Sequence, residues 1–123
     1  MIMVKFDQGE QMLYIHNEGS TSIDEIVKTV SDYFRNDKLP HPVRILEFVT
    51  ADFMRGSVNE WNKFEDNLKV WIRKFSSVRH AVICHDPFVV AKIILLEPKI
   101  KPFNYTINVF STEAVARHWL SEN

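Results

Sequence analysis

The sequence is poor in cysteine and glycine, and these shortages exclude several kinds of protein. Its 123 residues include one cysteine, Cys84, and three glycines. A single cysteine rules out an intramolecular disulfide and a cysteine-rich metal site, and it is typical of a chain in a reducing cytoplasm. The glycines form no phosphate-binding loop. We therefore expect a cytoplasmic protein without a bound cofactor or metal.

Excess charge and long apolar runs are lacking as well. The 15 Lys and Arg side chains are balanced by 16 Asp and Glu side chains, for a formal net charge of −1. Without a basic excess to neutralise phosphates, we expect no nucleic-acid partner. The longest nearly apolar run, Pro87 to Leu96, is far shorter than the ~20 residues of a membrane-spanning helix. The first residues show no signal-peptide pattern, because Lys5 and Asp7 interrupt their apolar run.

The chain is rich in core-forming residues that follow the periods of strands and helices. Hydrophobic residues make up 46% of it, and the length fits one domain over residues 1–123. Capping residues mark the helices: Ser22 and Ser57 each precede a glutamate by three residues, and Asp86 precedes Pro87. The patterns predict strands at 1–6, 11–16, 43–49, 79–85 and 104–110, helices at 23–36, 58–75 and 88–96, and a last helix capped by Ser111 or Thr112.

These elements define the expected fold class. Strands that alternate with helices indicate parallel pairing through crossovers, and the first two strands read as a hairpin. We expect an α/β fold with a mixed five-stranded sheet flanked by four helices, in the order ββαβαβαβα. Residues 88–96 are also rich in β-branched side chains, so a strand is the alternative there, but the Asp86-Pro87 cap favours a helix. Residues 97–102 are expected to form a loop, and Val115, Trp119 and Leu120 to face inward.

Four stretches resemble the STAS-like superfamily, in particular its branch similar to stage II sporulation protein AA. They are Gly19-Ser20-Thr21-Ser22, Arg44–Val49 with the following Thr50-Ala51-Asp52-Phe53, Arg79–Pro87 and Val109–Leu120. The resemblance implies a mixed sheet flanked by helices and a binding or regulatory role rather than catalysis. Related folds bind nucleotides, lipids or protein partners.

The resemblance also draws attention to Ser57. In the anti-sigma antagonists of the superfamily, a phosphorylatable serine follows an aspartate at the start of the second helix. Ser57 stands at the matching position, but Gly56 precedes it where the antagonists have the aspartate, so the match to their phosphorylation motif is incomplete. A helix N-terminus can bind phosphate or another anion. The spacing of Ser57 and Glu60 favours a plain capping box instead.

Cys84, His85 and Asp86 are candidates for chemistry that the pattern does not favour. Neighbouring residues on a strand point to opposite faces, so Cys84 and His85 cannot form a nucleophile–base pair. Cys84 reads as a small core residue, while His85 and Asp86 lie where a strand ends and a helix begins, a place where α/β sheets bind ligands. The five histidines show no metal-binding spacing. We therefore predict that the protein is not an enzyme.

The segment Phe88–Leu96 is the most informative feature, because only Lys92 in it is polar. A helix that is apolar all round must be covered on more than one side. The leading hypothesis is a regulatory or protein-interaction domain that forms a homodimer through this helix. The alternative is a carrier of a small apolar or lipid-like ligand. The candidate interface or ligand-contacting residues are Phe88, Val90, Ile94, Leu95, Phe53 and Met54.

Overall fold

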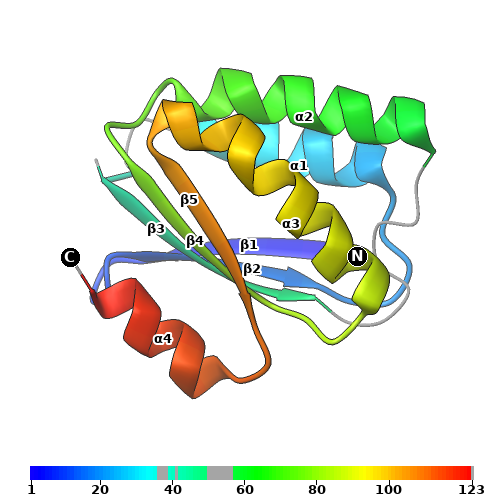
Figure 1. Cartoon of the computed structure of the whole chain (residues 1–123). Helices are drawn as coiled ribbons and strands as arrows, with labels where there is room; N and C mark the ends of the chain where they lie inside the picture. The colour runs from blue at the N-terminus through cyan, green and yellow to red at the C-terminus, as the bar shows by residue number, and fades with distance from the viewer. Residues whose placement is uncertain (36–38, 41, 50–56, 123) are drawn as a thin grey trace.

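The computed structural model describes residues 1–35, 39–40, 42–49 and 57–122, which form one mixed sheet with four α-helices (Figure 1). This is the fold class and the order of elements that the sequence predicts. The elements are β1 (Ile2–Asp7), β2 (Met12–Asn17), α1 (Ile23–Phe34), β3 (Val43–Val49), α2 (Val58–Ile72), β4 (Val78–Ile83), α3 (Pro87–Ile100), the short 3₁₀ helix η1 (Lys101–Phe103), β5 (Tyr105–Phe110) and α4 (Glu113–Ser121).

The strands lie in the sheet in their sequence order, β1-β2-β3-β4-β5. β1 pairs with β2 antiparallel, as a hairpin requires, and every later pair is parallel. Each parallel step is connected by one helix, and these helices, α1, α2 and α3, lie on the same side of the sheet (Figure 1). The last helix, α4, covers part of the opposite side. The two faces of the sheet therefore support two separate cores.

Alternation along the strands assigns side chains to the two cores. On β3, Ile45 and Val49 enter the larger core under α1, α2 and α3, whereas Leu46 enters the smaller one. The smaller core consists of Met12, Leu46 and Ala81 from the sheet with Ala116 and Leu120 from α4. Because strand neighbours point to opposite faces, a single buried strand can supply both cores.

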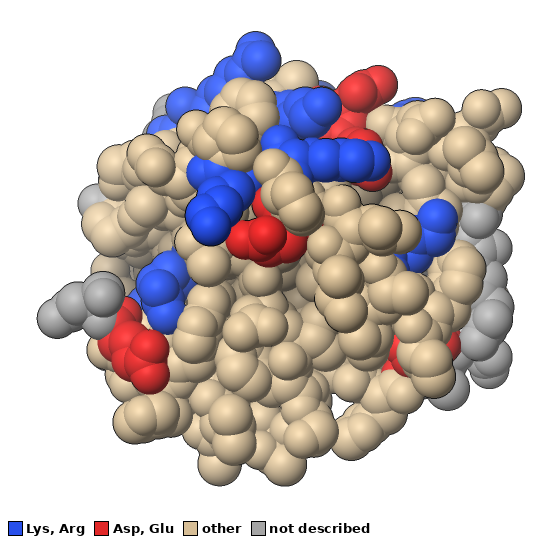
Figure 2. Space-filling model, in the orientation of Figure 1, with Lys and Arg blue, Asp and Glu red and all other residues tan. Residues whose placement is uncertain are grey.

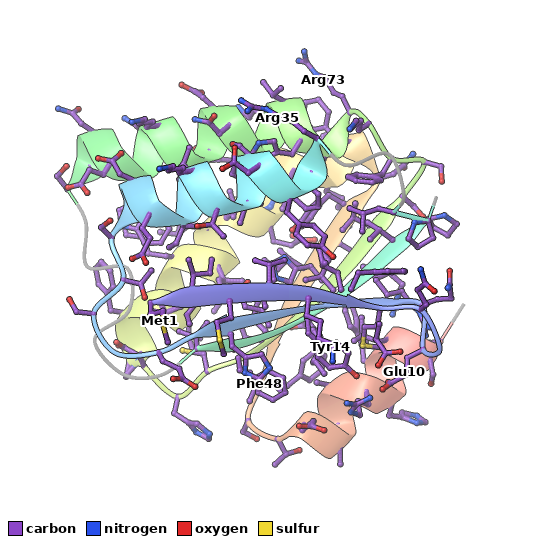
Figure 3. The ribbon with its side chains drawn as sticks, turned by 180° about the vertical axis from the view of Figure 1, so that it is seen from behind. Met1, Glu10, Tyr14, Arg35, Phe48 and Arg73 are labelled. Atoms are coloured by element: carbon purple, nitrogen blue, oxygen red, sulfur yellow. The ribbon has the colours of Figure 1, made fainter. Side chains whose placement is uncertain are left out.

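Polar contacts at the sheet edge fix the position of α4. Arg117 donates hydrogen bonds to Glu113, Glu10 and the Tyr14 hydroxyl, each over 2.8 Å. Figure 3 shows Glu10 and Tyr14 on the α4 side of the sheet, with Phe48 further along the same face. These hydrogen bonds raise the pKa of the Arg117 guanidinium. They also lower the pKa of Glu10, because Arg117 stabilises its carboxylate.

Capping residues stand where the sequence predicts them. Ser22, Ser57, Asp86 and Thr112 are the N-caps of α1, α2, α3 and α4, and each side chain accepts a backbone N–H. At Ser57 both halves of a capping box are formed with Glu60. The Asp86-Pro87 start settles residues 88–96 as helix rather than strand.

Two expectations about individual segments are wrong. Residues 97–100 continue α3 instead of forming a loop, even though Pro98 lies inside the helix. Proline at this position removes the hydrogen-bond donor for the Ile94 carbonyl, and Ile94 lies on the exposed side of the helix, where it is 64% exposed. Val115 is also exposed, because Ala116 and Leu120 provide the buried side of α4.

Candidate ligand-binding site

A small cavity lies between the sheet and the three helices on its larger side. Its volume is about 70 Å³, roughly half of the ~150 Å³ of an engineered apolar cavity that binds benzene. The sheet, α1, α2 and α3 all contribute apolar walls, among them Ile26, Val30, Leu68, Val89, Ile93 and Ile107. A space of this size and lining suits an apolar molecule of a few non-hydrogen atoms.

A chain of four hydrogen-bonded side chains lies on the sheet side of this cavity. Asn17 Nδ2 donates to Glu47 Oε2 over 2.6 Å, and His80 Nε2 lies 2.7 Å from Glu47 Oε1. The other ring nitrogen, His80 Nδ1, is hydrogen-bonded to the Tyr105 hydroxyl. Glu47, His80 and Tyr105 line the cavity. Buried polar groups are expensive unless they are paired, so the network accounts for the presence of these side chains in an apolar core.

The network crosses the sheet diagonally, with one member on each of β2, β3, β4 and β5. The residue directly opposite Asn17 is Val49, and Glu47 lies two residues before it. The same two-residue offset recurs at each further step. Val82 is opposite Glu47, and His80 lies two residues before Val82. Ile107 is opposite His80, and Tyr105 lies two residues before Ile107. Diagonal neighbours on one face of a sheet are close enough for long side chains to touch, as the hydrogen bonds between these residues show. The parallel register therefore brings the four polar groups into contact.

The direction of donation within the network follows from its chemistry. A carboxylate only accepts, so Asn17 and His80 both donate to Glu47. The roles at His80 depend on its tautomer: the neutral ring that donates from Nε2 accepts at Nδ1, and in that form Tyr105 is the donor to His80. With its proton used in this way, the Tyr105 oxygen retains lone pairs but has no proton to offer. The sheet side of the cavity therefore presents acceptors only.

Burial also changes the acidity of Tyr105. The side chain is 3% exposed, and desolvation, with a smaller contribution from the Glu47 charge, raises its pKa well above the usual value. Loss of the proton would create a tyrosinate in an apolar core beside a carboxylate. Tyr105 therefore stays protonated at physiological pH and keeps its hydrogen bond to His80.

This raised pKa predicts a loss of stability at alkaline pH. In the unfolded chain a tyrosine ionises near pH ~10, whereas Tyr105 in the folded protein does not. The protonated Tyr105 therefore contributes its full share of the stability below that pH. Above it, the free energy of unfolding falls by up to about 1.4 kcal/mol per pH unit, because only the unfolded chain loses the proton. Urea unfolding of the wild type and of Tyr105→Phe between about pH 9 and about pH 11 measures it. Equal pH slopes for the two proteins would contradict the prediction.

At the opposite side of the cavity, α2 and α3 present donors. Trp61 is 8% exposed and lines the cavity. Its indole N–H has no hydrogen-bond partner among the described residues. Lys92 Nζ lies 5.4 Å from the Trp61 ring centroid and 5.6 Å from that of Phe88. Such cation–π contacts hold the ammonium group beside the two rings.

A second, outer cleft adjoins this end of the cavity. It has a volume of about 120 Å³ and lies between α2 and α3, where exposed residues such as Val58 and Leu95 line it. Trp61, Lys92 and Leu96 line both spaces. These three side chains therefore lie between the inner cavity and the outer cleft.

The site residues predicted from the sequence lie mostly outside the cavity. Ile94 and Leu95 are 64% exposed, Val90 is half-buried, and Phe88 packs against Trp61 with ring centroids 6.4 Å apart. Val89, Ile93 and Leu96 of the same helix do line the cavity. Phe53 and Met54 lie outside the described residues. The helix is thus two-sided, with one buried face and one exposed apolar face.

Ser57 and Cys84 have plain structural roles. The Ser57 hydroxyl accepts from the Glu60 N–H over 3.2 Å, and the Glu60 carboxylate accepts from the Ser57 N–H. An anion at Ser57 stays a prediction, and the carboxylate already at this helix start opposes it by charge repulsion. Cys84 is buried whereas His85 is exposed, so the two do not form a pair.

Burial predicts that Cys84 reacts slowly with thiol reagents. Desolvation raises the pKa of the Cys84 thiol, and the thiolate is the reactive form. We expect native protein to remain unlabelled by iodoacetamide and unfolded protein to take up one label. A Ser76→Cys variant, which adds a cysteine at an exposed position, should take up one label in the native state and serves as the control. Rapid labelling of native wild-type protein would contradict the buried position.

Comparison with known proteins gives no family assignment, since no protein-family model, curated protein or solved structure matches the chain. None of the described helices combines the length and hydrophobicity needed to cross a membrane. Within the described ranges, no three His, Cys, Asp or Glu side chains come together as metal ligands.

Sequence reasoning missed Glu47, His80 and Tyr105 as a group. The signal was present in the strand alternation, because Glu47 shares the parity of Val43, Ile45 and Val49 in a strand interpreted as buried. A charged residue on the inward face of such a strand indicates either a partner or a site. His80 has the same position relative to Val78 and Val82.

Proposed function

We propose that this domain binds a small, predominantly apolar molecule in the cavity between the sheet and helices α1, α2 and α3. The observation that supports this most directly is an apolar cavity with a buried polar network along one wall. Ligand sites are typically apolar spaces with a few convergent polar groups that orient the ligand. The proposal agrees with the binding or regulatory role that the STAS-like resemblance implies, and with a cytoplasmic location for a chain with one buried thiol.

The chemistry of the network supports binding rather than catalysis. His80 is hydrogen-bonded through both ring nitrogens, so neither is free to take a proton from a substrate. Tyr105 is a poor nucleophile because burial raises its pKa. The Cys84 thiol is buried and hydrogen-bonded to the Asp86 backbone. We therefore propose a non-catalytic role for the domain.

The test compares cavity-filling and surface variants by native mass spectrometry of freshly purified protein. Val89→Phe places a large ring in the cavity wall, where Val89 is 2% exposed. Val70→Phe makes the same change on α2, where Val70 is 66% exposed. We expect a bound small molecule in the wild type and in Val70→Phe, and its loss from Val89→Phe. A wild-type spectrum without any adduct, or an adduct that persists in Val89→Phe, would count against the cavity as the binding site.

The exposed face of α3 supports a second candidate function, self-association. Ile94 and Leu95 are adjacent and 64% exposed, and Figure 2 shows a wide uncharged area over α3 and β5. Exposed apolar patches of this kind commonly mark protein contacts. Light scattering of a homodimer should show twice the mass of one chain, and Ile94→Glu should restore the mass of a monomer. Val115→Glu, at an exposed residue of α4, is the matched control and should remain dimeric.

A further inference from the structure

We infer that the ligand of the inner cavity carries an O–H or N–H donor, and that this donor binds the Tyr105 oxygen. The inference rests on the proposed function and adds to it the chemical class of the ligand. Three residues supply the argument, because the polar cavity lining on the sheet side consists of Glu47, His80 and Tyr105.

The first step concerns which of these groups still has a proton to give. His80 uses both ring nitrogens, towards Glu47 and towards Tyr105. Glu47 accepts from Asn17 at one oxygen and from His80 at the other. Since a carboxylate cannot donate, the protons of the network all point toward Glu47. With His80 as the neutral Nε2–H tautomer, none of these three lining groups has a donor left for a ligand.

The second step concerns which acceptor a ligand can reach. A phenolic oxygen that donates one hydrogen bond can still accept another. Tyr105 comes from β5, lies at the end of the network, and lines the cavity. Each Glu47 oxygen already accepts one side-chain hydrogen bond, whereas the Tyr105 oxygen accepts none from the described side chains, so among the cavity-lining groups of the network it is the acceptor that lacks a donor.

The third step is discrimination between ligands of the same shape. An alcohol donates to the Tyr105 oxygen and satisfies it. A ketone of identical skeleton has no proton for the Tyr105 oxygen; its carbonyl oxygen can only accept, for instance from the Trp61 indole N–H on the α2 side, and this leaves the Tyr105 oxygen without a donor. A site built around a buried polar group rejects the analogue that lacks the complementary partner. The cavity should therefore select donors among molecules that fit it equally well.

Propan-2-ol and acetone provide the test, because they share one non-hydrogen skeleton and differ in the donor. Binding is followed by NMR through the methyl groups of Ile26, Val89 and Ile107, which line the cavity, with exposed Ile94 as an internal reference. We expect saturable shifts at the cavity methyls and roughly tenfold tighter binding of propan-2-ol than of acetone. In Tyr105→Phe the two affinities should become equal. Tyr33→Phe, which removes a hydroxyl away from the cavity, should keep the preference.

Each outcome separates the inference from the proposed function. Equal affinities in the wild type, or a preference for acetone, would overturn the inference and leave the cavity as a binding site. A preference for acetone would mean that Tyr105 keeps its proton for the ligand. If neither probe saturates the cavity methyls, the inference and the proposed function both fail. Should Tyr105→Phe not fold, the wild-type comparison with the Tyr33→Phe control still decides the question.

Discussion

A Glu47→Leu variant is expected to unfold with a free energy about 3–5 kcal/mol lower than that of the wild-type chain. The Glu47 side chain is 13% exposed and accepts hydrogen bonds from Asn17 and His80. The substitution removes the acceptor of the Asn17 amide and of the His80 ring N–H. Removing one partner of a buried polar pair lowers the stability by more than the intact pair adds to it, because the other partner stays buried without its hydrogen bond. Urea denaturation followed by circular dichroism measures the change.

The control for this prediction is a carboxylate that forms an ion pair nearer the surface. Glu65 is paired with Lys99 at 3.2 Å, and the Lys99 side chain is 53% exposed. Glu65→Leu should change the free energy of unfolding by less than about 1 kcal/mol. A triple variant that combines Glu47→Leu with His80→Phe and Tyr105→Phe removes the polar groups that lost their partner. This triple variant should recover part of the free energy of unfolding that Glu47→Leu loses. A loss below about 1 kcal/mol for Glu47→Leu alone would contradict a tightly bonded buried network.

The fold could be predicted from local patterns because those patterns agree with one another. The alternation on β3, the caps at Ser57 and Asp86, and the apolar stripe of α1 each favour one structure, and tertiary packing preserves them. The C-terminal part of α3 escaped prediction because Pro98 usually ends a helix. Here the helix continues, since Ile100 is completely buried and packing outweighs the missing hydrogen bond.

The site was harder to predict, because it depends on register rather than on local sequence. Glu47 and His80 are 33 positions apart and lie on different strands. Their contact requires the two-residue diagonal offset between β3 and β4, which no single strand reveals. Alternation alone indicates that both side chains face the larger core. The cavity is less predictable still, because it is formed where side chains of three helices and the sheet fail to fill the space between them.

The position of the apolar residues on α3 connects the two candidate functions. Val89 and Leu96 face inward and line the cavity, whereas Ile94 and Leu95 face solvent. The outer cleft between α2 and α3 includes Leu95 on its wall. A partner that covers this part of α3 would therefore also cover the cleft beside Trp61 and Lys92. Binding in the cavity and association through α3 are consequently linked by geometry, and each can be tested by a variant that leaves the other surface unchanged.

Trp71 of α2 is part of the cavity wall, and Trp71→Ala should lower the free energy of unfolding by about 3–5 kcal/mol. Trp71 is 7% exposed, its indole N–H donates to Ser31 Oγ over 3.0 Å, and its ring lies 5.8 Å from that of Phe34. Because Trp71 also lines the cavity, its truncation enlarges the space rather than opening a separate one. Indole should then raise the melting temperature of Trp71→Ala, since a ligand of the folded state stabilises it.

The control is Val70→Ala, at the residue before Trp71 and on the exposed side of α2. It should change the free energy of unfolding by no more than about 0.5 kcal/mol. Indole should have no effect on that control, and an equal rise in both variants would place its binding at the surface instead of under α2.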